Sequence, residues 1–429
     1  MIKDSIKDKR VLVLSNNCFS LSNSNGRTLG NLFWGWPKEN LAQFCVIARD
    51  PNWDVCSNYY CLEDRSVLKS FIHCKKAEGR RLYQAASECV VDSNTIKISK
   101  KTVCKVIIRE LVWSCKRWES ISFKRWVNDF DPEVIVLQFG DSIFMQNIAY
   151  SISRERKIPL VIYNTEGYYF FSQNWYHSSL GDGLIFRIYK SVYKKVVRKL
   201  MGITSFCVYL NDKLKSDYDK EFGANSIVIY NSSSLEVSKP MAMSKKISRI
   251  SYLGNLDLYR DSAIMEVAEV LREINPEFNV DVYGRASESI RQRLESAPGV
   301  VYRGFITYDK VIKVIEESDV LLHVETEQGN KEWQLQYAFT TKIADSLSSG
   351  KCFVVYAPKE LACSQYVESH QCGYVASDKE ELKKVLDSVI YDDSIRNKII
   401  NNSLEVAMQN HNLQTNANKF QSILHEVQI

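Results

Sequence analysis

Hydroxyl, ammonium and carboxylate side chains occur close together in the segment 340–351. Thr340 or Thr341 can cap a helix whose first turn contains Lys342, and Asp345 lies one turn further along. The N–H groups of such a helix start, the hydroxyls and Lys342 can bind phosphate oxygens, while Asp345 can accept a hydrogen bond from a sugar or ribose hydroxyl. The segment therefore predicts a site for phosphate and sugar groups. The alternative is an ordinary capped helix with a Lys342–Asp345 ion pair.

A second candidate site for an anion follows the strand-like segment 249–253. Gly254 allows the backbone to approach a ligand, and Arg260, at the start of the next amphipathic segment, can contact a phosphate with two N–H groups. We expect these two residues to contribute to a phosphate site. The alternative is that Arg260 lies on a solvated loop.

The elements that must position these groups recur along the chain. Short β-branched segments alternate with amphipathic segments of ten or more residues, which predicts parallel sheets covered by helices on both faces. Residues 51–100 are polar and irregular, and we expect an insertion or a set of loops there. The predicted strands are 10–15, 44–48, 134–139, 159–163 and 205–210 in the first half, and 249–253, 278–283, 300–304, 320–324 and 352–356 in the second.

The length of 429 residues predicts two domains. The segment 232–247, which is rich in Ser and Lys and contains Pro240, reads as a linker between a Rossmann-like domain at 1–231 and a second one at 248–410. The helical segment 411–429 is expected to return to the first domain. Two doubly wound domains predict a central cleft, because such sheets bind ligands beyond the carboxyl ends of their strands.

The composition indicates the broad class of protein to which the chain belongs. The chain is 45% hydrophobic and 25% charged, which is typical of a folded protein rather than a disordered one. It contains no run of ~20 apolar residues and starts without a signal peptide, so we expect a cytoplasmic location. Its twelve cysteines form no CxxC pair. They are expected to be reduced thiols, and neither a metal site nor a cofactor is predicted.

Charge is divided unevenly along the chain. Residues 1–231 contain 34 Lys and Arg against 23 Asp and Glu, whereas residues 232–429 contain 22 against 28. The basic first half favours an anionic partner such as a phospholipid, a nucleic acid or a phosphate-bearing substrate. Uneven solvation is the alternative. No RNP or zinc-finger pattern supports nucleic-acid binding.

Several motifs follow one another in an order that is similar to a known family. They are Gly254-Asn255-Leu256, Val282-Tyr283-Gly284, Gly304-Phe305-Ile306, the segment Asp319 to Glu325, and Thr340-Thr341-Lys342-Ile343-x-Asp345-x-Leu347-x-x-Gly350-Lys351. This order resembles the C-terminal half of family-4-like glycosyltransferases of the GT-B fold, over residues 248 to about 375 and more loosely over the first half. The resemblance implies an α/β GT-B fold, a nucleotide-sugar donor, retention of anomeric configuration and no obligatory metal.

The resemblance also assigns donor-binding residues. Gly254 and Arg260 match the phosphate loop Gly-Arg-Leu-x-x-x-Lys, and Asp345 matches the second acid of the Glu-x7-Glu signature. Asn255 stands at the usual arginine position and Tyr337 at that of the first glutamate. Lys342 can replace the missing cation and Glu325 the missing carboxylate, although Glu325 also fits a solvated strand end. The donor-binding residues expected on this basis are Gly254, Asn255, Arg260, Gly284, Glu325, Thr340, Thr341, Lys342 and Asp345.

In the first half, the resemblance points to loops that follow strands. Gly26 and Arg27 look like the glycine loop that faces donor and acceptor in such enzymes; the alternative is a plain turn before a helix. Asp141 and Glu166 stand just past strands, where this fold places groups that orient the acceptor or act as general base.

Two further segments, 102–126 and 186–201, interleave basic and apolar residues at helical spacing. The first contains Trp113, Trp118 and Trp126. Such helices can lie at an anionic lipid surface, and the alternative is a buried helix with a basic solvent face.

Together, the residues and the resemblance predict a hexosyltransferase-like enzyme in cell-surface polysaccharide synthesis. It would move a sugar from a nucleotide sugar to a hydroxyl of a glycan or lipid-linked acceptor, with possible contact with the inner face of the plasma membrane and none with nucleic acid. Arg260 and Lys342 would neutralise the leaving diphosphate, and Glu166 and Asp141 would act on the acceptor. Replacing either cation with alanine is expected to slow transfer and leave the fold intact. The alternatives are a nucleotide-sugar epimerase of the same shape, a non-catalytic relative and a basic nucleic-acid-binding protein.

Overall fold

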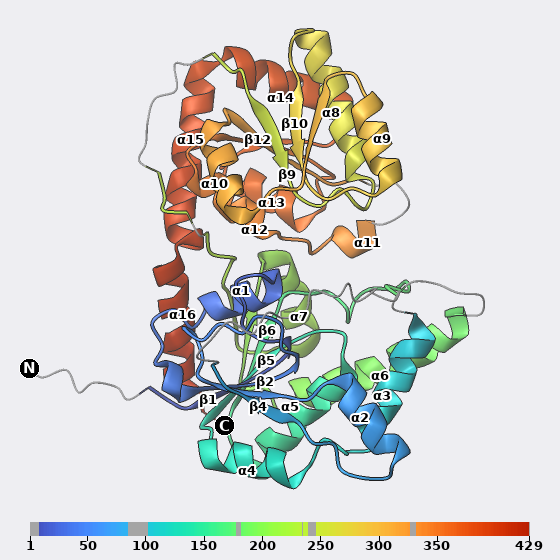
Figure 1. Cartoon of the computed structure of the whole chain (residues 1–429). Helices are drawn as coiled ribbons and strands as arrows, with labels where there is room; N and C mark the ends of the chain where they lie inside the picture. The colour runs from blue at the N-terminus through green and yellow to red at the C-terminus, as the bar shows by residue number, and fades with distance from the viewer. Residues whose placement is uncertain are drawn as a thin grey trace, which may run out of the picture. The chain divides into compact units, whose positions relative to one another are not determined.

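The computed structural model describes residues 8–84, 102–176, 182–233, 235–238, 246–326 and 332–428. Parts of the expected loops at 51–100 and of the expected linker at 232–247 lie outside these residues. Contacts divide the chain into two units, the first made of Met1–Ile229 with Ala417–Ile429 and the second of Tyr230–Asn416 (Figure 1). The sequence analysis places the corresponding boundary at residue 231.

The first unit is built on an eight-stranded sheet of order β4-β3-β2-β1-β5-β6-β7-β8. Its pairs are parallel except for β3 with β4. The strands are β1 (Val11–Asn17), β2 (Leu41–Ile47), β3 (Asn58–Cys61), β4 (Arg80–Leu82), β5 (Val134–Gln138), β6 (Leu160–Asn164), β7 (Phe206–Tyr209) and β8 (Ser226–Val228). The α-helices are α1 (Ser24–Asn31), α2 (Asp64–Ile72), α3 (Val103–Ser114), α4 (Ile121–Phe130), α5 (Ile143–Arg156), α6 (Asp182–Met201) and α7 (Asp212–Phe222).

The second unit contains a six-stranded parallel sheet of order β11-β10-β9-β12-β13-β14. Its strands are β9 (Ile250–Leu253), β10 (Val280–Tyr283), β11 (Val300–Gly304), β12 (Val320–Val324), β13 (Cys352–Tyr356) and β14 (Tyr374–Ala376). Its α-helices are α8 (Arg260–Ile274), α9 (Glu288–Ser296), α10 (Tyr308–Glu317), α11 (Glu332–Leu335), α12 (Thr341–Ser348), α13 (Ala362–Ser369), α14 (Lys379–Tyr391) and α15 (Asp393–Val406). A π-helical turn, Ala407–His411, follows, and α16 (Leu413–Glu426) ends the chain.

Both sheets reverse their strand order beside the first strand of the unit. In the first sheet, the strands run outward from β1 to β4 on one side and from β5 to β8 on the other. In the second sheet, they run outward from β9 to β11 on one side and from β12 to β14 on the other. In open parallel sheets this switch point leaves a crevice at the carboxyl ends of the strands, and ligands bind there. The α/β architecture expected from the sequence is thus confirmed, and it directs attention to the ends of β1, β5, β9 and β12.

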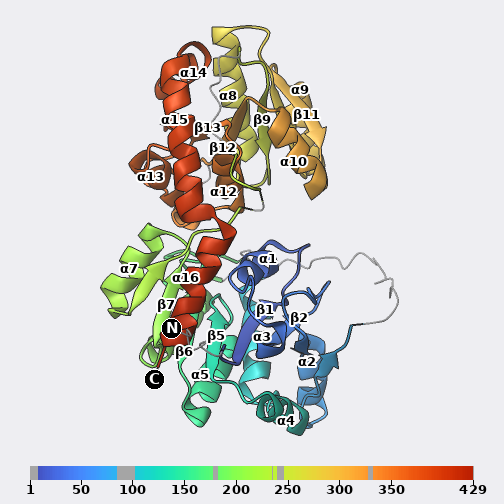
Figure 2. The same ribbon diagram turned by 90° about the vertical axis from the view of Figure 1, so that its left-hand side faces the viewer.

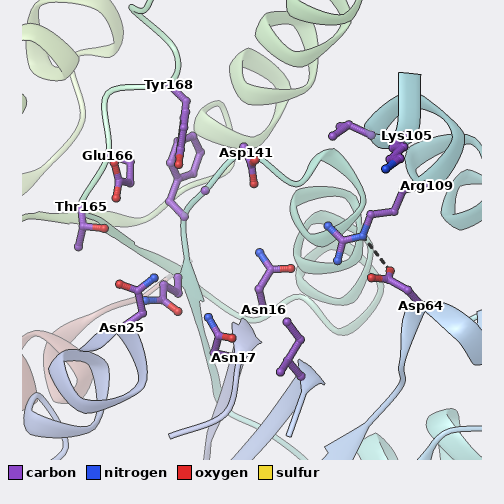
Figure 3. Close-up of a pocket in the computed structure, with 15 residues that line it drawn as sticks. Asn16, Asn17, Asn25, Asp64, Lys105, Arg109, Asp141, Thr165, Glu166 and Tyr168 are labelled. Carbon is purple, nitrogen blue, oxygen red and sulfur yellow. Dashed lines mark hydrogen bonds and ion pairs between the residues drawn. The ribbon is translucent and has the colours of Figure 1, made fainter. Parts of the chain in front are cut away.

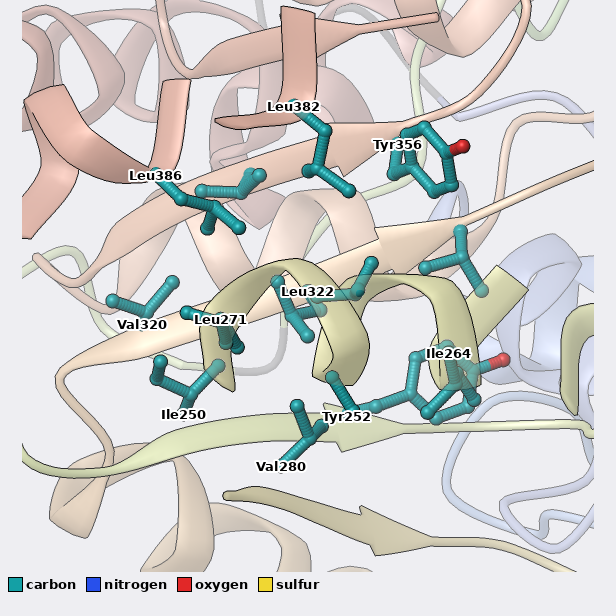
Figure 4. Packing of buried hydrophobic residues seen from close by; sticks show 14 of the residues in the cluster. Ile250, Tyr252, Ile264, Leu271, Val280, Val320, Leu322, Tyr356, Leu382 and Leu386 are labelled. Atoms are coloured by element: carbon teal, nitrogen blue, oxygen red, sulfur yellow. The ribbon is translucent and has the colours of Figure 1, made fainter. Parts of the chain in front are cut away.

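The cores explain why the chain adopts these sheets. Strand β1 begins with four apolar residues that are fully buried, as expected for a strand covered on both faces. In the second unit, Ile250 and Tyr252 pack with Ile264 and Leu271 of α8 in one continuous apolar cluster (Figure 4). The last helix, α16, which is labelled in Figure 2, adds Phe420, Ile423 and Leu424 to the core of the first unit, and Val427, just beyond the helix, belongs to the same core.

Two expectations about local structure are wrong. The segment 51–100 contains the strands β3 and β4 and the helix α2, because Tyr59 and Tyr60 are core residues that pair with β2. The segment 102–126 is not one helix, since α3 ends at Ser114 and Ser120 caps a separate helix, α4. Among the described residues, no helix combines the length and the apolar character that crossing a bilayer requires.

Candidate functional site

The carboxyl ends of β9 and β10 come unusually close to one another. The Gly254 N–H donates to the carbonyl oxygen of Tyr283 at 2.9 Å, and the Gly284 N–H donates to that of Gly304 at 3.0 Å. A Cβ at position 284 would collide with the carbonyl oxygen of Gly254. The two glycines expected at the donor site therefore allow a close backbone approach at the switch point of the second sheet.

Arg260 and Glu325 form a buried ion pair across this switch point. Arg260 opens α8, and Glu325 directly follows β12. Two parallel hydrogen bonds join them, Nε to Oε2 at 2.9 Å and Nη2 to Oε1 at 2.8 Å. The residues are only 8% and 2% exposed, so each charge depends on the other for its solvation. Arg260 is thus not a solvated loop residue, and its charge is already balanced.

Lys342 is a second cation at the same place, and it is not balanced in this way. It lies in the first turn of α12, is half-buried, and holds its ammonium 4.8 Å from the centroid of the Tyr252 ring. A Cβ on Gly254 would collide with its Nζ. Burial, assisted by the positive charge of Arg260, lowers the pKa of Lys342 to about 8. The negative charge of Glu325 opposes this shift but is outweighed by burial and by Arg260.

The other expected donor residues have distinct surroundings. Thr340 is the N-cap of α12, and its Oγ1 is buried without a hydrogen-bond partner in the described part of the chain. Thr341 is the first residue of that helix. Asp345 is buried and accepts a hydrogen bond from Ser233 Oγ at 2.8 Å. Asn255 shapes the loop after β9, since its Oδ1 accepts the N–H of Asp257 at 2.9 Å.

One neighbour of the ion pair was missed by the sequence analysis. His323, on β12, is buried, with Nε2 3.6 Å from Glu325 Oε1. Burial and the charges of Lys342 and Arg260 place its pKa well below the ordinary value, so the imidazole is neutral. Its only signal in the sequence was its position two residues before Glu325. The described residues contain no group of three or more His, Cys, Asp or Glu that could hold a metal ion.

The first unit has a cavity of about 460 Å³ at the carboxyl ends of β1, β5 and β6 (Figure 3). Most of its lining side chains are polar. They come from the ends of these strands, from the starts of α1 and α2 and from one face of α3. The lining residues are Asn16, Asn17, Asn25, Ile47, Asp64, Lys105, Val106, Arg109, Gln138, Phe139, Gly140, Asp141, Thr165, Glu166 and Tyr168.

Asp141 and Glu166 both line this cavity, but their environments differ. Asp141 accepts hydrogen bonds from the hydroxyl of Tyr176 at 3.0 Å and from Ser142 Oγ at 3.4 Å. The turn that carries Glu166 is held by its N–H, which donates to Asn164 Oδ1 at 2.9 Å. Burial, together with the nearby charge of Asp141, raises the pKa of Glu166 to about 7. Glu166 can therefore accept or release a proton near neutral pH.

The basic side of the cavity was not predicted. Lys105 and Arg109 lie four residues apart on α3, and the Arg109 Nε donates to Asp64 Oδ1 at 2.8 Å. These residues belong to the segment 102–126, which the sequence analysis placed either at a lipid surface or in a buried helix with a basic face in solvent. Its Trp113, Trp118 and Trp126 are buried core residues. The Asn16-Asn17 pair, at the carboxyl end of the strand β1, was a visible signal that went unused.

The expected glycine loop lies beside this cavity. Gly26 is buried in the first turn of α1, where a Cβ would collide with the carbonyl oxygen of Cys18. Its neighbour Asn25 lines the cavity, whereas Arg27 is not among the lining residues. Gly26 therefore serves close packing, and Asn25 is the residue of this loop that faces the cavity.

Comparisons with known proteins agree with this architecture. A family model described as glycosyl transferase-like matches residues 262–422. The chain is similar in structure to HepE (Alr3699) from Anabaena in complex with UDP, with a TM-score of 0.62 and 13% identity over 97% of this chain and 100% of that one. It is also similar to sucrose-phosphate synthase from Thermosynechococcus elongatus, with a TM-score of 0.61 and 11% identity over 96% and 97% of the two chains.

A further similar structure is WaaG, a glycosyltransferase involved in lipopolysaccharide biosynthesis, with a TM-score of 0.56 and 11% identity over 96% of this chain and 99% of that one. No curated protein sequence matches significantly. The structural likenesses confirm the GT-B fold. With the family match, they support a glycosyltransferase.

The buried pair of Arg260 and Glu325 changes the result that we expect for Arg260→Ala, which the sequence analysis expected to leave the fold intact. Arg260→Ala leaves the Glu325 carboxylate buried without its partner, so we expect a loss of about 3–5 kcal/mol in the free energy of unfolding, measured with urea. Arg303→Ala, which breaks a 2.8 Å pair with Asp281 at a half-exposed arginine, is the matched control and should cost about 0–1 kcal/mol.

The double variant Arg260→Met/Glu325→Leu removes both charges and should recover most of the stability lost by Arg260→Ala. An Arg260→Ala protein as stable as the Arg303→Ala control would contradict this account of the pair.

Proposed function

We propose that the protein is a family-4-like glycosyltransferase that moves a sugar from a nucleoside diphosphate sugar to a hydroxyl of a glycan or lipid-linked acceptor. The second unit binds the donor and the first unit binds the acceptor. The observation that carries the proposal is Lys342, a half-buried ammonium at the sheet's switch point, within the segment that matches the glycosyl transferase-like model.

The groups around Lys342 suit a diphosphate. Gly254 and Gly284 let the strand ends and Lys342 pack closely, and the N-terminal turn of α12 presents N–H groups beside the Thr340 hydroxyl. As the bond between the anomeric carbon and the diphosphate oxygen breaks, negative charge develops on that oxygen. Lys342 neutralises this charge in the transition state. Arg260 contributes to the local field while remaining bound to Glu325.

The cavity of the first unit suits a saccharide. Asn16, Asn17 and Asn25 provide amide donors and acceptors for hydroxyl groups, and Tyr168 provides an aromatic wall. In this scheme Glu166 takes the proton of the attacking acceptor hydroxyl while the new glycosidic bond forms, and Asp141 orients the acceptor.

Two structural neighbours suggest the chemical identity of the substrates. HepE has been solved with UDP-glucose, and WaaG takes part in lipopolysaccharide biosynthesis. We therefore take a UDP-sugar as the first donor to test and a cell-surface glycan or its lipid-linked precursor as the acceptor class, with the reaction at the inner face of the plasma membrane. We also propose retention of anomeric configuration, with the acceptor hydroxyl attacking from the face that the diphosphate leaves, and no metal requirement. These are to be checked by NMR of the product and by transfer in EDTA.

Donor binding gives the first test. Lys342→Ala removes a charge-assisted contact to the diphosphate, so its affinity for UDP should fall about ten- to hundredfold in calorimetry. Lys313→Ala, at an exposed lysine of the same unit, is the control and should bind UDP as the wild type does. GDP, ADP and CMP sugars would be screened in parallel by thermal shift. Equal UDP affinity in Lys342→Ala and the control, or no nucleotide binding at all, would refute the donor site.

The pH dependence of transfer gives a second test. The rate needs Glu166 deprotonated, so kcat/KM should rise with pH through about 7. It also needs Lys342 protonated, so kcat/KM should fall above about 8. Glu166→Gln should remove the acidic limb and lower kcat about 10²- to 10⁴-fold. Glu133→Gln, an exposed position in the same unit, should leave the profile unchanged. An acidic limb that persists in Glu166→Gln would exclude Glu166 as the base.

A further inference from the structure

Three neighbouring helices of the first unit expose a concentration of large apolar side chains. Helix α3 packs against both α2 and α6, and the three lie side by side in Figure 1. Many of the large hydrophobic residues exposed in the described part of the chain lie on these helices, and we call this set the apolar face. Its members, with their exposed fractions, are Leu68 (45%), Phe71 (42%), Ile72 (65%), Ile108 (58%), Leu111 (61%), Leu184 (68%), Ile188 (58%) and Val192 (48%).

These side chains are not needed for the core of the unit. On α6, Phe186, Tyr189 and Tyr193 are buried and provide the inward stripe of the helix. Leu184 and Ile188 recur four residues apart on the exposed side of the same helix. A helix that is apolar on its exposed side as well as its buried side indicates that something covers the exposed side in use.

The charges around the apolar face favour an anionic surface. Basic residues number two on α2, two on α3 and six on α6, whereas each helix has a single acidic residue. Of these acids, Asp64 is paired with Arg109, and Glu110 accepts the N–H groups of Ile143 and Phe144 at the start of α5. Arg198 of α6 is also paired, with Glu221. Basic residues still outnumber acidic ones on these helices, and apolar side chains beside such an excess of lysines and arginines are typical of helices that lie in the interface of an anionic bilayer.

The apolar face adjoins the cavity of the first unit. The same helix, α3, supplies Ile108 and Leu111 to the face and Lys105 and Arg109 to the cavity wall, and α2 supplies Asp64 to that wall. A molecule with its lipid in a bilayer and its saccharide outside could occupy both surfaces at once.

We propose that the apolar face binds an anionic bilayer surface and thereby selects a lipid-linked acceptor, whose saccharide occupies the adjoining cavity. The assignment of the acceptor rests on the proposed function, whereas bilayer binding does not. The occupant is the lipid surface itself, held by the apolar side chains inserted among its headgroups and by Arg187 and Lys195, which are exposed on α6.

The test is flotation of the full chain with vesicles of phosphatidylcholine alone or of phosphatidylcholine mixed with phosphatidylglycerol. Wild type should bind the mixed vesicles and lose binding in high salt. Ile108→Ser/Leu111→Ser and Arg187→Glu/Lys195→Glu should each reduce the partition coefficient at least about tenfold. The matched controls in the second unit are Tyr391→Ser/Ile395→Ser and Lys384→Glu/Lys398→Glu, which remove exposed residues of similar kind and should bind as wild type does.

Each outcome decides the proposal. No binding of wild type to mixed vesicles, equal binding to neutral vesicles, or equal loss in the test and control variants would overturn it. Self-association in sedimentation that disappears in Ile108→Ser/Leu111→Ser would assign the face to a second copy of the chain instead. UDP affinity, measured on the same variants, should not change, so a failure of bilayer binding is distinguishable from a failure of the donor site.

Discussion

Two opposite charges can be buried side by side only when each replaces the water that the other has lost. Arg260 and Glu325 meet this condition through two hydrogen bonds, and they link the start of α8 to the end of β12 where the second sheet reverses its strand order. Because the two charges of this pair cancel, the net positive charge of the site comes from Lys342. Gly254 and Tyr252 confine that ammonium beside the pair, and the same confinement lowers its pKa.

The first unit shows the same principle applied to carboxylates. Asp141 accepts hydrogen bonds from Tyr176 and Ser142. Glu166 lies in the same cavity, and burial raises its pKa to about 7. A pair of carboxylates in different environments can divide the work of orienting a hydroxyl and taking its proton. Burial thus brings the pKa of one carboxyl group, that of Glu166, and of one ammonium group, that of Lys342, close to neutral pH.

Much of the fold could be predicted because it depends on local patterns. Apolar strands separated by amphipathic segments indicated two parallel sheets, and Thr340, one of the two threonines expected to cap α12, is its N-cap residue. The pairing of Arg260 with Glu325 could not be predicted, because the two residues are 65 positions apart and meet only through the strand order. Lys105 and Arg109 were missed for the same reason, since their helix reaches the cavity through its packing on α2 and α6. The burial of Trp113 and Trp126 agrees with the alternative of a buried helix, but helical spacing alone could not choose between that alternative and a lipid surface.

The central claim is that Lys342 binds the diphosphate of the donor, and proton uptake on binding tests it most directly. With a pKa of about 8, half of the Lys342 side chains are neutral at pH 8, and a bound diphosphate restores their charge. Calorimetry of nucleoside diphosphate binding in buffers of different ionisation enthalpy should therefore show an uptake of about half a proton at pH 8, which disappears in Lys342→Arg. Binding with the same proton count in the wild type and Lys342→Arg would contradict the account.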